Sequence, residues 1–127
     1  MGMSELKKIN KTLALAAILE ALTGLALVID PSIVAQLLIG SELVSVGAVI
    51  GRIAGASLMA FGVACWPGDL FSNRKGLIAM LLYGLLITFY LGYLGITRQY
   101  NGPLLLPAII THATITGLLT YQACKRL

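Results

Sequence analysis

Charged residues are scarce in this chain of 127 residues. Aspartate, glutamate, lysine and arginine make up 11% of it, whereas hydrophobic residues make up 58%. The mean hydropathy is +0.93. A soluble domain of average composition carries about 25% charged residues. The few charges here cannot cover the surface of a folded chain, so a soluble domain is excluded and an integral membrane protein is predicted.

Histidine and cysteine are also rare. The chain has one histidine, His112, and two cysteines, Cys65 and Cys124, with no CxxC pair. A haem or metal site needs more such ligands, so we expect no cofactor and no metal. No phosphate-binding motif occurs, and Ser45 and Ser57 have no base at their predicted depths. These absences favour a non-enzymatic role without excluding an enzyme.

Long apolar runs are the dominant feature that is present. Four windows, at about 12–29, 44–66, 76–97 and 104–123, have the length of about 20 residues that a membrane-spanning helix needs. Their connectors are too short to hold another domain. The sequence therefore predicts a single transmembrane domain over 1–127, an all-α four-helix up-down bundle.

The first long connector carries a further helix signal. Asp30-Pro31 ends the first span, because proline disfavours helical geometry at the residue before it. The segment 32–40 is apolar but too short to cross a bilayer. We expect a short interfacial helix between the first two spans, closed by Gly40.

The net charge of +4 is placed asymmetrically. Seven of the nine lysines and arginines fall on one side of a four-span topology: Lys7, Lys8, Lys11, Arg74, Lys75, Lys125 and Arg126. The positive-inside rule then predicts a multi-pass protein of the cell (inner) membrane with both termini in the cytoplasm. The basic residues are topology determinants that can contact anionic lipids, so nucleic acid is not expected as a partner.

A carboxylate interrupts the first span. Glu20 shares one helix face with the small residues Ala16, Ala17 and Gly24, so it is expected to point into the bundle. A charge at this depth costs about 3 kcal/mol and marks a candidate functional site.

The second span contains a Gly-x-x-x-Gly ladder of Gly47, Gly51 and Gly55, which predicts close helix packing. Arg52 lies directly beside this ladder. At about 1.5 Å per residue, polar side chains from all four spans fall about 11–14 Å below the outer surface. They are Glu20, Arg52, Thr88, Tyr90 and His112, with Thr116 one turn beyond His112.

We therefore expect an ion pair between Glu20 and Arg52, supported by the other polar groups of this layer. Three interpretations stay open. The pair can fix helix register, it can form an outward-opening site for a ligand or a proton, or it can contact another subunit. His112 beside a carboxylate could titrate near neutral pH.

Several short motifs resemble the DoxX-like group of small four-helix membrane proteins. They are Glu20-Ala-Leu-Thr-Gly24, Asp30-Pro31, Leu38-Ile39-Gly40 and Gly51-Arg52-Ile-Ala-Gly55, all in the first half of the chain. The resemblance implies an up-down helical bundle and transfers no catalytic residue. Ala17-Ile-Leu-Glu20 is similar to the first span of small multidrug-resistance exporters, but Arg52 and the one-sided basic residues count against that family.

The expected function is a binding or accessory role in the membrane, with the polar layer as its site. The alternative is a small proton- or substrate-coupled transporter that uses Glu20. The expected partners are the lipid bilayer, a small apolar or amphipathic ligand, and further copies of the chain or a larger membrane complex.

Overall fold

All regular structure in the described residues is helical. The computed structural model of this chain describes residues 3–68 and 70–125, so Arg126 of the basic set lies outside it. The helices are α1 (Met3–Ile29), α2 (Pro31–Ile39), α3 (Val46–Ala64), α4 (Leu70–Thr97) and α5 (Leu105–Cys124). The all-α class is confirmed, and the short helix expected over 32–40 is α2.

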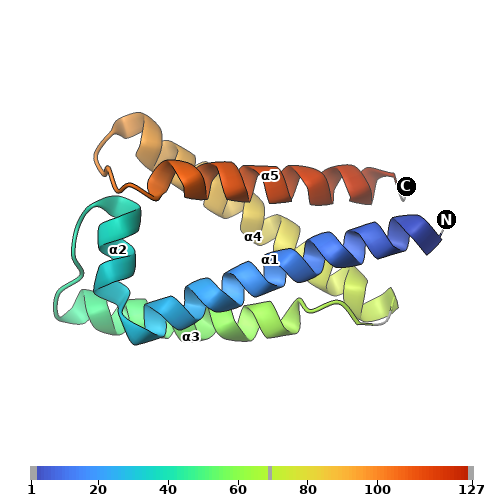
Figure 1. Ribbon diagram of the computed structural model, residues 1–127, viewed down its shortest axis with the longest axis horizontal. Coiled ribbons are helices and arrows are strands. Elements are labelled where there is room, and N and C mark those ends of the chain that lie inside the picture. The colour runs from blue at the N-terminus through green and yellow to red at the C-terminus, as the bar shows by residue number, and fades with distance from the viewer. Residues whose placement is uncertain (1–2, 69, 126–127) are drawn as a thin grey trace.

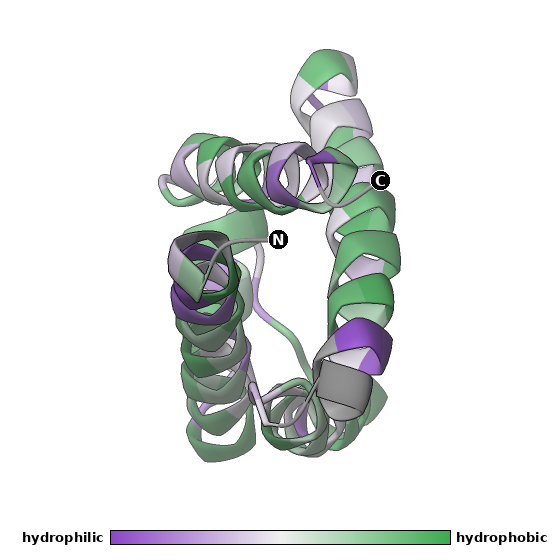
Figure 2. Ribbon diagram, turned by 90° about the vertical axis from the view of Figure 1, so that its right-hand side faces the viewer, coloured by the Kyte–Doolittle hydropathy of each residue, from purple (hydrophilic) through white to green (hydrophobic). Residues whose placement is uncertain are grey.

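The four long helices extend along the long axis of the molecule, and α2 lies across one end of it (Figure 1). The most extensive packing joins α1 to α3, followed by α4 with α5, and α1 connects the two pairs through contacts with both α4 and α5. Seen from its end, the molecule shows these helices around a shared centre (Figure 2). Both termini and the α3–α4 connector lie at the end opposite α2 (Figure 1).

Three helices are long and apolar enough to cross a membrane. They are Leu6–Ile29, Val46–Ala64 and Arg74–Thr97 within the described residues. The expected fourth span is not among them, because α5 carries His112, Gln122 and four threonines. Large apolar side chains on these helices are exposed, as Leu22, Phe89 and Ile96 show, so the helices carry the outward faces of a membrane protein.

Glycine brings α1 and α3 into backbone contact. A β-carbon placed on Gly55 would lie 2.6 Å from the carbonyl oxygen of Gly24, and one on Gly24 would lie 2.5 Å from that of Gly55. Gly51 packs on Pro31 of α2, and Gly62 packs on α1 at Ala17. The predicted ladder thus serves helix packing from Gly51 onward, and Gly62 extends it.

Gly47 is the exception in that ladder. Its nearest neighbour is the side chain of Leu43, in the connector just before α3. Within the ladder, contact with another helix therefore begins at Gly51, against α2, and contact with α1 begins at Gly55.

The α1–α2 corner has a well-defined cap. The carboxylate of Asp30 accepts hydrogen bonds from the backbone N–H groups of Ser32 and Ile33, both 3.1 Å long, and Pro31 opens the helix. At the other end Gly40 adopts a left-handed φ of 72° and donates its N–H to the carbonyl of Gln36. This corner positions α2 across the ends of the long helices.

Gly55→Ala is expected to destabilise the fold by about 1–3 kcal/mol, because its new methyl group would collide with the backbone of α1. The matched control is Gly92→Ala on α4, where a β-carbon meets nothing within 4 Å. That change should be neutral or stabilising by about 0.5–1 kcal/mol. Reversible unfolding in mixed micelles measures both, and equal losses for the two variants would contradict the close α1–α3 contact.

Candidate functional site

Glu20 is buried among the long helices. Glu20 is 5% exposed, and it belongs to a buried stripe on α1 with Leu13, Ala16, Ala17 and Gly24. These positions recur every three or four residues and so share one face of the helix. The expectation that Glu20 points inward agrees with this placement.

Tyr83 on α4 is the hydrogen-bond partner of Glu20. Its hydroxyl donates to Oε2 of Glu20 over 2.9 Å. Its ring lies 5.1 Å from that of Phe61 on α3 and meets His112 on α5 edge-on, at 6.1 Å between ring centroids. All four long helices therefore meet at Tyr83.

His112 is the second polar neighbour of Glu20. Its Nδ1 lies 3.8 Å from Oε1 of the carboxylate, and the two groups form an ion pair only when the imidazole is protonated. The side chain of His112 is 24% exposed, against 7% for that of Glu20. His112 is therefore more accessible from outside than the carboxyl group of Glu20. We call Glu20, Tyr83 and His112 the polar cluster.

The predicted pair between Glu20 and Arg52 is not formed. Arg52 lies on the exposed side of α3, whereas Glu20 is bonded to Tyr83 and faces His112. The cause is the packing of α3: Gly51 and Gly55 face α2 and α1, which turns the neighbouring position outward. Depth in the membrane did not predict this contact, because it does not tell which side of its helix a residue faces.

The other predicted members of the layer lie elsewhere. Tyr90 is exposed on α4, two turns from Tyr83. Thr88 and Thr116 line an apolar groove of about 440 Å³ between α4 and α5, together with Leu85, Phe89, Ala113, Gly117, Thr120 and Tyr121. The Thr88 hydroxyl is buried there without a hydrogen-bond partner among the described residues.

Tyr83 was missed as a site residue although a signal for it was present. It shares a helix face with Tyr90, seven residues away, which corresponds to about 10 Å along a helix. Counting from the outer end of α4 favoured Tyr90, but that count assumes upright helices. The diagonal course of α4 in Figure 1 brings the earlier tyrosine to the level of Glu20.

Comparisons with known proteins add nothing to this geometry: no family model, no curated protein and no solved structure matches the chain. The resemblance to the DoxX-like group therefore stays a prediction.

Tyr83→Phe is expected to destabilise the fold by about 1–3 kcal/mol, because it leaves a buried carboxyl oxygen without its donor. Tyr90→Phe, the same change at an exposed site, should have little effect. In a double-mutant cycle with Glu20→Gln, Tyr83→Phe should show a coupling of at least about 0.5 kcal/mol. Arg52→Gln should change the unfolding free energy by less than about 0.5 kcal/mol. A larger loss of stability would instead favour an ion pair between Glu20 and Arg52.

Proposed function

We propose that this chain is a small polytopic membrane protein with a non-enzymatic binding role, and that the polar cluster recognises an amphipathic ligand. The observation that carries the proposal is the buried Glu20 carboxyl, which is held by Tyr83 and faces the partly exposed His112. A carboxyl group inside a membrane costs free energy, so its presence there indicates a function.

The groove between α4 and α5 supports the choice of an amphipathic ligand. It runs along the same helix pair that supplies Tyr83 and His112, and its walls are apolar apart from threonine and tyrosine hydroxyl groups. Thr116 lines the groove, and its hydroxyl occupies the space where a β-carbon on Gly84, the residue after Tyr83, would lie. The groove suits the apolar body of a ligand, and the cluster suits its polar group.

The binding test uses tetraphenylphosphonium, a lipophilic cation, as the probe. Glu20→Gln should weaken its binding by about tenfold or more, because it removes the negative charge that attracts the cation in a low-dielectric environment. The matched control is Glu42→Gln, which makes the same change at an exposed site near the start of α3. Calorimetric titration in detergent measures both, and equal affinities for the two variants would overturn the role of Glu20.

A coupled transporter is the second candidate. What favours it is the position of Arg52, because that arginine does not neutralise Glu20 and the carboxyl is free to exchange a proton. In proteoliposomes with an imposed pH gradient, a transporter would move the probe and lose this activity in Glu20→Gln. A binding protein would retain the probe without moving it.

For the membrane arrangement we propose a four-helix up-down bundle in the cell membrane, with α5 as the fourth span and both termini in the cytoplasm. The segments with Lys7, Lys8, Lys11 and Lys125 and the α3–α4 connector lie at one end of the molecule, which supports this orientation. Since α5 packs along α4, it can cross the bilayer with His112 and Thr116 directed toward its neighbours.

The orientation is tested by the reaction of Cys124 with a membrane-impermeant maleimide. Cys124 is exposed at the end of α5, whereas Cys65 is buried. We expect labelling in inverted membrane vesicles, no labelling in intact cells, and no labelling of Cys124→Ser in either. Labelling of the native chain in intact cells would reverse the proposed orientation.

A further inference from the structure

A second pocket lies at the α2 end of the molecule, away from the polar cluster. Its volume is about 310 Å³, and it lies where the last turn of α4 meets the first turns of α5. The lining residues are Gly95, Arg98, Tyr100, Asn101, Gly102, Leu105, Leu106 and Ile109. Arg98 is the one charged residue among them, and none is acidic.

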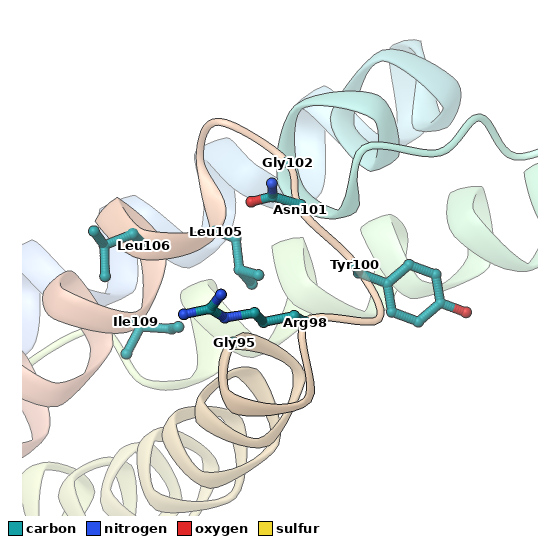
Figure 3. A pocket seen from close by; sticks show the side chains of 8 residues that line it. All are labelled: Gly95, Arg98, Tyr100, Asn101, Gly102, Leu105, Leu106 and Ile109. Carbon is teal, nitrogen blue, oxygen red and sulfur yellow. The ribbon is translucent and has the colours of Figure 1, made fainter.

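Arg98 is directed along this pocket. In Figure 3 its side chain extends from the end of α4 toward Leu105 and Ile109, whereas the ring of Tyr100 points away. The guanidinium group forms no ion pair with any carboxylate of the described residues. An arginine that lies against leucine and isoleucine without a carboxylate partner can still donate several hydrogen bonds.

The backbone at Arg98 is strained. Its φ of 52° lies in the left-handed region, which glycine and asparagine adopt far more readily than arginine. Such conformations persist where the surrounding structure imposes them, and they gather at ligand-binding sites. Here the conformation ends α4 and directs the following connector toward α2.

The connector from Arg98 to Leu104 is fixed before any ligand binds. The backbone N–H groups of Asn101 and Leu104 donate to the carbonyls of Ile39 and Leu37 at the end of α2, over 3.3 and 2.8 Å. Gly102 contacts the backbone of α2 at Leu37 and Leu38, where any side chain would collide. Because these walls are already held in place, binding of a ligand costs little conformational entropy.

We propose that this pocket binds the oxyanion headgroup of an amphiphile, and that the headgroup is the phosphate of an anionic membrane lipid. The planar fork of Arg98 matches the geometry of a phosphate, and the amide of Asn101 lies at the same opening. Leu105, Leu106 and Ile109 form the apolar side, where the first part of an acyl chain packs. The positive end of the α5 dipole adds to the attraction.

This site is independent of the polar cluster. Arg98 lies in the α4–α5 connector and Glu20 on α1, and none of the three cluster residues lines the pocket. Loss of one function therefore leaves the other measurable. The site also lies just beyond the end of α4, one of the three helices long and apolar enough to cross a bilayer. In the membrane arrangement proposed above, such a helix end reaches the lipid headgroups.

The experiment measures binding of phosphatidylglycerol to the purified protein in detergent by native mass spectrometry. Phosphatidylcholine and inorganic phosphate serve as separate competitors. The test variant is Arg98→Gly, which removes the guanidinium group and relieves the left-handed backbone, so a folding defect is not expected. The matched control is Arg52→Gln, which removes the positive charge of an exposed arginine on α3.

We expect Arg98→Gly to weaken phosphatidylglycerol binding by about tenfold, Arg52→Gln to leave it unchanged, and phosphatidylcholine to compete poorly. Arg98-dependent binding of inorganic phosphate alone would keep the oxyanion site but assign it to a soluble ligand. Equal binding by the native chain and Arg98→Gly would overturn the proposal. Equal losses in both variants would also overturn it, because they would indicate general electrostatic attraction.

Discussion

The close approach of α1 to α3 sets the directions in which the polar side chains of this molecule point. Gly24 and Gly55 leave no room for a β-carbon between the two backbones, so the helices meet at a fixed register and rotation. With the helices held in this way, Glu20 on α1 meets Tyr83 of α4 and His112 of α5, whereas Arg52 on α3 faces outward. A helix contact built on glycine thus decides which polar residue Glu20 meets.

The polar cluster lowers the free-energy cost of burying the Glu20 carboxyl group among apolar helices, and it does so without a permanently charged partner. Glu20 is supported by a neutral phenol and by an imidazole whose charge depends on pH, rather than by a permanently charged guanidinium group. A carboxylate held by arginine would form a permanent ion pair, whereas an ion pair with His112 forms only when the imidazole is protonated. The cluster therefore gives the buried carboxyl group one hydrogen bond, from Tyr83, and one titratable neighbour, His112.

The two ends of the molecule are built differently. At the end with the termini, basic residues lie near apolar packing around Ile9, Leu13 and Leu119. At the α2 end, Asp30, Gly40 and Gly102 fix the connectors through caps and backbone contacts, and a smaller apolar cluster of Leu91, Leu94 and Leu105 packs beneath them. The Arg98 pocket lies at this end, where contacts with α2 hold the α4–α5 connector that forms one of its walls.

The amino-acid sequence by itself determined the membrane class, the helical secondary structure, the helix end at Asp30-Pro31 and the inward direction of Glu20. Each of these depends on local composition or on helical periodicity, which the order of residues states directly. The partner of Glu20, the outward position of Arg52 and the role of Tyr83 were decided only by the tertiary structure. They depend on the tilt of α4 and on the rotation of α3 about its axis, and both result from side-chain packing between helices that are distant in sequence.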